Sequence, residues 1–205
     1  MNQTINTAPV NSQRNWFRKI GGVATLIAGM LLLIAIISLL APANGWLSPF
    51  QDVWLVLIFK LHAEFAGIGP DVLHGLHFLD ILILALVGIL CLSLNIIFEK
   101  AGKVWSLVAI ALTLAGIVLY LITQIAGRST VMLAVLIISL VMLSNKTFNK
   151  TTAWAGIFAS VFLFTGDLTV GVHSNVITVL FEVGYVGLMG WLFMTGIRVL
   201  RMGTR

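Results

Sequence analysis

Apolar residues of this chain fall into long runs separated by short polar connections. About 20 helical residues cross the hydrocarbon layer of a bilayer, and the runs are near that length. They predict an all-α polytopic membrane protein with six transmembrane helices, of which the fourth is the shortest. The runs cover residues 20–40 and about 76–98, 104–126, 129–143, 152–172 and 175–199.

The connection between the first two runs, residues 42–75, is the only long one. Its middle holds the apolar stretch 53–59, which is too short to span, followed by Lys60, His62 and Glu64. A crossing here would move every later loop to the other side of the membrane. We therefore predict an interfacial or re-entrant helix that lies on the outer face.

The polar N-terminal segment, residues 1–15, is predicted to be a disordered cytoplasmic tail. A cleaved signal peptide is the alternative interpretation of the first apolar run, but the apolar core of a signal peptide has only about 7–15 residues. The run 20–40 is longer, so we interpret it as a retained first helix. Residues 16–205 then form a single six-helix transmembrane domain.

Composition and charge support this class. The chain is 60% apolar and only 9% charged, with a mean hydropathy of +1.08, whereas soluble domains carry about 25% charged residues. With six crossings, ten of the twelve Lys and Arg residues fall on one side, and only Lys60 and Arg128 fall on the other. The positive-inside rule then predicts a plasma (inner) membrane protein with both termini in the cytoplasm.

The expected partners can be inferred from the same pattern. Basic residues stand in short clusters beside apolar runs, which is topogenic and does not indicate nucleic acid. Membrane lipids are the expected partners, together with protein subunits or further copies of the chain. The lone Cys91 excludes an internal disulfide and is predicted to be a packing residue, and Asn95 is predicted to form an interhelical hydrogen bond.

Three acids are expected at one depth in the outer leaflet and are the candidates for catalysis, although no catalytic role is assigned. Asp80, Asp167 and Glu182 lie five to seven residues inside their spans, which is about 7–11 Å at 1.5 Å per residue. Ionised groups in lipid are costly and usually face the bundle interior in pairs. We predict that at least two of these acids converge. The alternative is that each is protonated or bonds separately to a neighbouring hydroxyl.

The most specific spacing is Asp71-x-x-His74-x-x-His77-x-x-Asp80. Steps of three residues on a helix turn by about −60°, so these side chains form a slanting stripe. They cannot all bind one ion, but a ligand from another helix can complete a zinc or iron site with two of them. The metal candidates are His74, His77, Asp80 and His173. The alternatives are histidines that bond to water or lipid phosphate at the headgroup level, and a proton relay.

Arg128, an outer cation, has three candidate roles. It can neutralise the acids, together with Gln124 expected a turn below it on the third helix, or hold an anionic lipid headgroup. It can also extend to the interface without a partner. On the last helix, Gly184, Gly187 and Gly190 predict a surface for close helix packing.

The last third of the chain holds the residues Trp154, Gly166, Asp167, Phe181, Glu182, Val183, Gly184, Tyr185, Arg198, Val199, Leu200 and Arg201. Through these residues it resembles the ending of small bacterial six-helix membrane proteins that are grouped as a family of unknown function. The likeness covers a third to a half of the chain, and it implies a bacterial or archaeal membrane and no activity. Membrane zinc hydrolases of the ceramidase type share the His and Asp chemistry, but their His-x-x-x-His on a late helix is absent here.

Three function classes remain open. Low charge and the lack of a sizeable extramembrane domain favour a non-catalytic scaffold, a lipid-binding protein or a subunit of a membrane complex. The first alternative is an outward-facing zinc hydrolase that binds metal through His74, His77 and a carboxylate, with another acid as general base. The second is a small transporter or proton pathway, although transporters are often built from inverted repeats and none is visible here.

Overall fold

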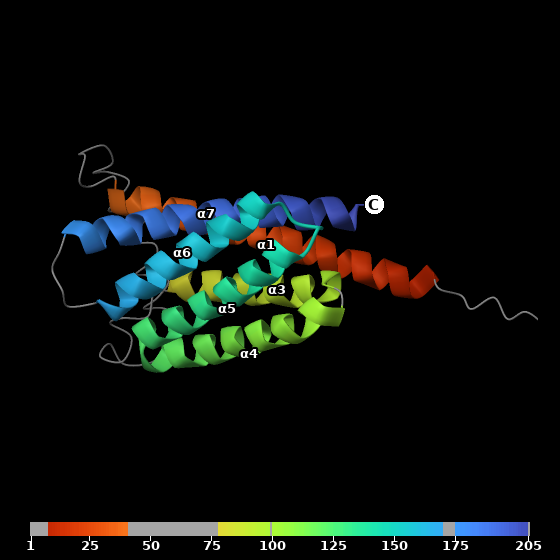
Figure 1. The fold of residues 1–205 in the computed structure, drawn as a ribbon, viewed down its shortest axis with the longest axis horizontal. Helices are drawn as coiled ribbons and strands as arrows, with labels where there is room; N and C mark the ends of the chain where they lie inside the picture. The colour runs from red at the N-terminus through yellow and green to blue at the C-terminus, as the bar shows by residue number, and fades with distance from the viewer. Residues whose placement is uncertain (1–7, 41–77, 99, 170–174, 205) are drawn as a thin grey trace, which may run out of the picture.

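A computed structural model of the chain describes residues 8–40, 78–98, 100–169 and 175–204. These residues form six α-helices and no strand, which confirms the all-α prediction for this part of the chain (Figure 1). The helices are α1 (Ala8–Leu40), α3 (Phe78–Ile97), α4 (Lys100–Ile122), α5 (Gln124–Ser144), α6 (Lys150–Leu168) and α7 (Asn175–Gly203).

Five of these helices, α1, α4, α5, α6 and α7, are long and apolar enough to cross a bilayer. α3 has 20 residues, and its described side chains form an apolar stretch over residues 81–97, which is shorter than the other five because the side chains of residues 78–80 lie outside the described set. The helices are therefore those of a multi-pass membrane protein, and the count of six crossings stays a prediction. The predicted interfacial helix within residues 42–75 lies outside the described residues.

The boundary between α4 and α5 differs from the prediction. The apolar pattern places a connection at residues 127–128, whereas the structure separates the two helices by Thr123 alone, in an extended conformation (φ −147°, ψ 112°). Gln124 therefore begins α5 and does not end the preceding helix, so its predicted place is wrong. One extended residue is enough to reverse the chain, and such a turn leaves no gap in hydropathy. At the other end of the chain, α1 already begins at Ala8.

Each described helix packs against the next along the chain, and α7 packs against α1. The six helices thus form a closed circuit in chain order, with neighbours running antiparallel (Figure 1). The start of α1 and the end of α7 meet at one end, since a Cβ added at Gly203 would lie 3.2 Å from the carbonyl oxygen of Asn15. This arrangement agrees with an even number of crossings.

Small residues permit the close approach of α6 and α7. A Cβ added at Gly184 would lie 2.9 Å from Leu163 Cγ, and one at Gly187 would lie 3.3 Å from Ala159 Cβ. The predicted packing role is confirmed for these two glycines. It is wrong for Gly190, where an added Cβ meets no atom within 4 Å, because this position has rotated away from the neighbouring helices.

Two sequence predictions for the region where α3 meets α4 are confirmed. The Ser106 hydroxyl donates to Asn95 Oδ1 at 2.6 Å, which is an interhelical hydrogen bond. Cys91 is fully buried, with its Sγ 3.6 Å from Thr113 Oγ1. Both contacts tie α3 to α4 within the bundle.

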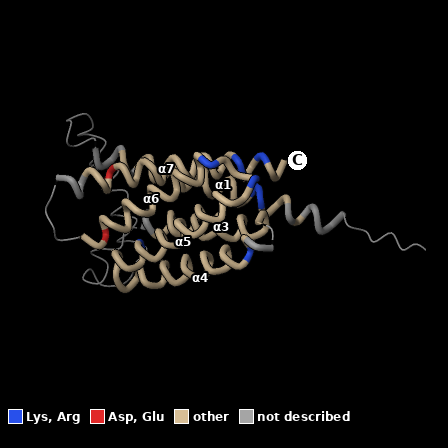
Figure 2. Tube along the Cα trace, viewed as in Figure 1, with Lys and Arg blue, Asp and Glu red and all other residues tan. Residues whose placement is uncertain are grey.

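Charge is divided between the two ends of the bundle (Figure 2). The end at which α1 begins and α7 ends, here called the basic end, carries all the described Lys and Arg side chains except Arg128. The opposite end, here called the acidic end, carries Asp167 and Glu182, the two described acidic side chains. The charge separation predicted from sequence is therefore present in space for the described residues.

The tight α4–α5 turn depends on Gly127. A Cβ added there would collide with the backbone of Tyr120. We expect Gly127→Ala to lower the free energy of unfolding in detergent by about 1–3 kcal/mol, as overpacking typically does. Gly190→Ala is the matched control, and it should be neutral or stabilise by up to about 1 kcal/mol, because Ala favours helix where space is open. Equal unfolding free energies for the two variants would contradict the turn geometry.

Candidate functional site

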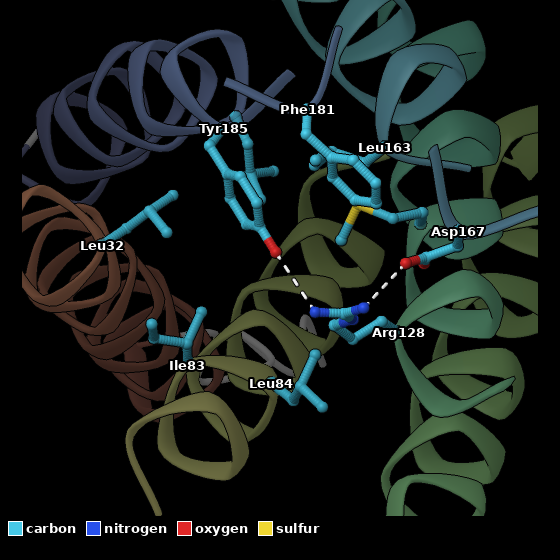
Figure 3. Close-up of a pocket in the computed structure, with 10 residues that line it drawn as sticks. Leu32, Ile83, Leu84, Arg128, Leu163, Asp167, Phe181 and Tyr185 are labelled. Carbon is cyan, nitrogen blue, oxygen red and sulfur yellow. Dashed lines mark hydrogen bonds and ion pairs between the residues drawn. The ribbon is translucent and has the colours of Figure 1, made fainter. Parts of the chain in front are cut away.

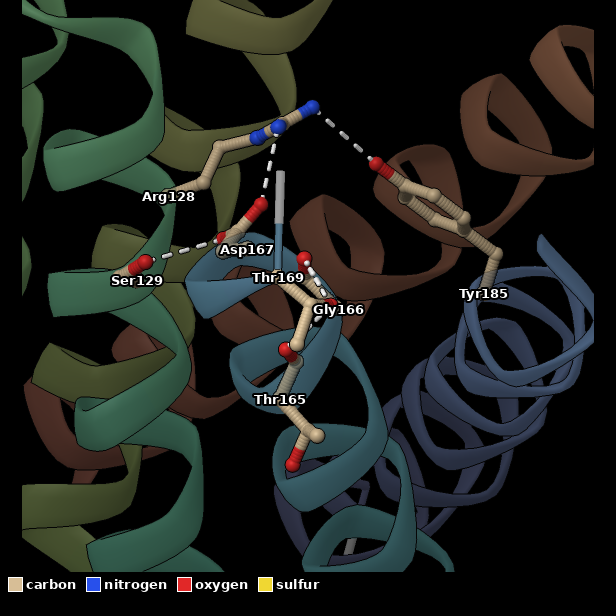
Figure 4. A network of polar contacts seen from close by, with 7 residues as sticks. All are labelled: Arg128, Ser129, Thr165, Gly166, Asp167, Thr169 and Tyr185. Carbon is tan, nitrogen blue, oxygen red and sulfur yellow. Dashed lines mark hydrogen bonds and ion pairs between the residues drawn. The ribbon is translucent and has the colours of Figure 1, made fainter. Parts of the chain in front are cut away.

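An ion pair between α5 and α6 is the central feature of the acidic end. Arg128 Nη2 donates to Asp167 Oδ1 at 2.9 Å, and the Ser129 hydroxyl donates to Asp167 Oδ2 at 3.0 Å (Figure 4). The Asp167 side chain is 2% exposed and that of Arg128 is 29% exposed. The carboxylate is thus enclosed with both oxygens bonded, while part of the guanidinium reaches the surface.

Local structure brings these side chains together. Arg128 and Ser129 lie in the second turn of α5, and Asp167 lies in the last turn of α6. Because α5 and α6 are antiparallel neighbours, the start of one faces the end of the other. The arginine also stands near the negative end of the α6 dipole, where a cation is favoured.

α7 joins the site through an aromatic residue. Arg128 Nη1 donates to the Tyr185 hydroxyl at 3.4 Å, a long hydrogen bond. Tyr185 stacks on Phe181 one turn earlier, with ring centroids 6.3 Å apart. A Cβ added at Gly166 would lie 2.6 Å from Phe181 Cε2, so the glycine allows this ring to sit against α6. Arg128 therefore bonds to both α6 and α7.

A cavity of about 50 Å³ adjoins the pair (Figure 3). Its walls come from α1, α3, α5, α6 and α7, and among the described residues that line it Arg128, Asp167 and Tyr185 are the polar ones. A water molecule needs roughly 10–15 Å³ of such space, so the cavity has room for a few waters. It is too small for a drug-sized ligand, whose pockets measure about 300–1,000 Å³.

The structure resolves the predicted role of Arg128 in part. The interpretation that Arg128 neutralises an acid is confirmed for Asp167. The alternative of binding an anionic headgroup stays a prediction, and the partly exposed guanidinium is compatible with it. Sequence reasoning missed Ser129 and Tyr185. Their signals were the position of Ser129 beside the arginine and the four-residue spacing of Phe181 and Tyr185.

Glu182 does not face the bundle interior, so the interior placement expected of all three acids is wrong for this one. The convergence of at least two acids now rests on Asp80 and Asp167 and stays a prediction. The side chain of Glu182 is exposed. It shares a face of α7 with Val179, Val183 and Val186, which are all about half exposed. Gly184 and Leu188 occupy the packed face instead. The direction in which the Glu182 side chain points is set by how α7 packs on its neighbours, which residue counts along the helix do not give.

The remaining site predictions are not tested. Asp80 lies in the first turn of α3, but its side chain is outside the described set. His74, His77 and His173 also lie outside it. Among the residues that the structure describes, no group of three or more His, Cys, Asp or Glu is placed to hold a metal ion. The predicted metal site therefore stays a prediction.

Comparison with known protein families, characterised proteins and solved structures finds no match. The resemblance noted for the last third of the chain therefore also stays a prediction, and the inference of function rests on the site.

Single substitutions in the ion pair should destabilise the protein more than removal of both charges. Breaking a fully buried pair costs about 3–5 kcal/mol. Because Arg128 is partly exposed, we expect about 1–3 kcal/mol for Asp167→Leu or Arg128→Met. The double variant should lie within about 1 kcal/mol of wild type. Unfolding free energies of the four proteins in one detergent give the coupling.

Glu182→Gln is the control for the loss of an acidic charge at the same end. It should change the unfolding free energy by less than about 0.5 kcal/mol, as surface substitutions usually do. If the costs of the two single substitutions simply add in the double variant, the pair does not link α5 to α6.

Proposed function

We propose that the protein is a non-catalytic integral membrane protein, acting as a scaffold or as a subunit of a membrane complex. One observation carries this proposal: Asp167 is enclosed, and its two oxygens accept hydrogen bonds from Arg128 and Ser129. Removing either partner of such a pair leaves a buried charge without compensation. This arrangement is suited to holding helices in place.

The Arg128–Asp167 pair holds helices together at the acidic end. Through Arg128 it connects α5, α6 and α7, which come together around a cavity too small for a sizeable substrate. Interhelical hydrogen bonds in membranes contribute about 0.6–2 kcal/mol each, so a network over three helices stabilises one arrangement of the bundle. A fixed lateral surface is what a scaffold or subunit presents to its lipid and protein neighbours.

The proposal includes the topology. The chain crosses the plasma (inner) membrane six times, and both termini lie in the cytoplasm. The support for this topology is the spatial separation of charge, because the described cations other than Arg128 gather at the basic end. Under the positive-inside rule that end faces the cytoplasm. The acidic end, with the ion pair and the predicted histidine segment, then faces outward.

Orientation can be tested by labelling single added cysteines, since the native Cys91 is fully buried. Thr123 in the α4–α5 turn and Thr204 after α7 are both exposed. A membrane-impermeant maleimide added to intact cells should label Thr123→Cys and leave Thr204→Cys unlabelled until the cells are opened. The reverse pattern would invert the topology, and labelling of both in intact cells would rule out opposite placement.

Metal content and proton flux separate the scaffold from the two alternatives. Protein purified without chelator should contain substoichiometric zinc and iron, and its proteoliposomes should take up no more protons than empty ones. Stoichiometric metal that disappears in His74→Ala/His77→Ala would contradict the scaffold proposal and favour the zinc hydrolase. Proton uptake that is lost in Asp167→Asn and retained in Glu182→Gln would contradict the scaffold proposal and favour the proton pathway.

A further inference from the structure

A second, larger hollow lies at the basic end, far from the ion pair. This open cleft of about 420 Å³, here called the basic cleft, lies between the α5–α6 turn and the last turns of α7. Its distance from Arg128 is about 24 Å along α5, at 1.5 Å per residue. The two sites share no residue.

Three cations line the basic cleft: Lys146 from the turn, and Arg198 and Arg201 from α7. All three side chains are exposed, and both described acids lie at the other end of the bundle. The charge of the cleft is therefore not compensated by any described carboxylate, in contrast to the paired charge at Arg128. Such a concentration of positive charge attracts anions.

One of these cations is held in position. Arg198 Nε donates to the backbone carbonyl of Thr147 at 2.9 Å, which fixes the guanidinium against the α5–α6 turn. The turn itself is ordered, because Asn145 Oδ1 accepts from the Thr147 N–H at 2.9 Å. The bond through Nε leaves the two terminal nitrogens of Arg198 to donate to a ligand, and paired guanidinium donors match the oxygens of phosphate.

The start of α6 adds to the positive potential. Asn149 caps this helix by accepting from the Thr151 N–H at 3.2 Å, and Thr152 in the first turn lines the cleft. The N-terminus of a helix favours anions through its dipole and its free N–H groups. This contribution reinforces the three side chains.

The cleft is amphipathic along α7. Met194 and Ile197 form part of its wall, and Ile197 is 44% exposed. Met194 lies one turn before Arg198, toward the middle of the bundle. Positive charge therefore stands at the rim, and apolar surface continues from it in the direction of the membrane core. An ion in water needs no such surface, whereas a lipid has acyl chains that would cover it.

We propose that the basic cleft binds an anionic phospholipid, with the headgroup phosphate between Lys146, Arg198 and Arg201 and the acyl chains along Met194 and Ile197. The proposal goes beyond the scaffold function, because it assigns a ligand to a different end of the molecule. It also holds if the ion pair proves to have another role.

The test compares lipid binding by variants that lose the same charge. Lys146→Gln/Arg201→Gln removes two cleft cations whose side chains make no hydrogen bond or ion pair with the described residues, so the fold should persist. Lys19→Gln/Lys103→Gln removes two exposed cations from the same end but outside the cleft. Each protein is reconstituted in nanodiscs of phosphatidylglycerol and phosphatidylcholine, and the lipids retained after detergent exchange are counted by native mass spectrometry.

We expect wild type and the Lys19/Lys103 variant to retain phosphatidylglycerol in preference to phosphatidylcholine. The cleft variant should lose about thirtyfold of this preference, since its two missing cations together contribute about 2 kcal/mol toward an anionic lipid and about 1.4 kcal/mol corresponds to tenfold. Equal preference in wild type and the cleft variant would overturn the proposal. An equal loss in both double variants would overturn it too, because it would show general attraction to the basic end.

Competition identifies the source of the phosphate. Inorganic phosphate and glycerol 3-phosphate are added at millimolar concentration to wild type in the phosphatidylglycerol nanodiscs. No displacement of the retained lipid would support a site that needs the acyl chains. Displacement by either soluble anion, together with lipid-independent binding that the cleft variant lacks, would overturn the lipid assignment in favour of a soluble phosphate ligand.

Discussion

The Arg128–Asp167 pair is the interaction on which the acidic end of the bundle depends, because it compensates the charge of a carboxylate that is only 2% exposed. An ionised Asp167, enclosed in the last turn of α6, is stabilised by a cation from a neighbouring helix, and Arg128 of α5 supplies it. Because α5 and α6 are antiparallel neighbours, the start of α5 lies opposite the end of α6. The tight α4–α5 turn, in which Gly127 lies against the backbone of Tyr120, is followed immediately by Arg128 and so places its guanidinium within reach of Asp167.

Helix association in lipid lacks the hydrophobic driving force available in water, so it relies on close packing and on polar contacts between helices. Both are present in this bundle. Gly184 and Gly187 bring α7 against α6, and Asn95 bonds to Ser106 between α3 and α4. Other buried hydroxyls, those of Thr25 and Ser160, donate to a carbonyl four residues earlier on their own helix. Such bonds remove the cost of a buried polar group without selecting a neighbour.

The two ends of the bundle differ in how their charge is compensated. At the acidic end the charge of Arg128 is met by a carboxylate of the protein itself, and the adjoining cavity holds a few waters at most. At the basic end three cations surround an open cleft with no described acid beside them. The first arrangement is suited to fixing the helices and the second to binding a ligand of opposite charge. This contrast separates the structural site from the ligand site in our interpretation.

The sequence by itself determined the properties that depend only on position along the chain. Hydropathy located the helices, the loop charges predicted the separation that Figure 2 shows, and residue counts put Arg128 and Asp167 at the same end. Tertiary structure decided what depends on rotation about each helix axis and on which helices are neighbours. Glu182 faces outward, on the same side of α7 as Val179 and Val186. Ser129 and Tyr185 complete the ion-pair network. Lys146 and Arg198 line one cleft although they are some 50 positions apart in the chain. The reason is physical: an apolar helix in lipid has apolar residues on all sides, so its sequence carries little periodicity to specify a buried face, and packing sets that face instead.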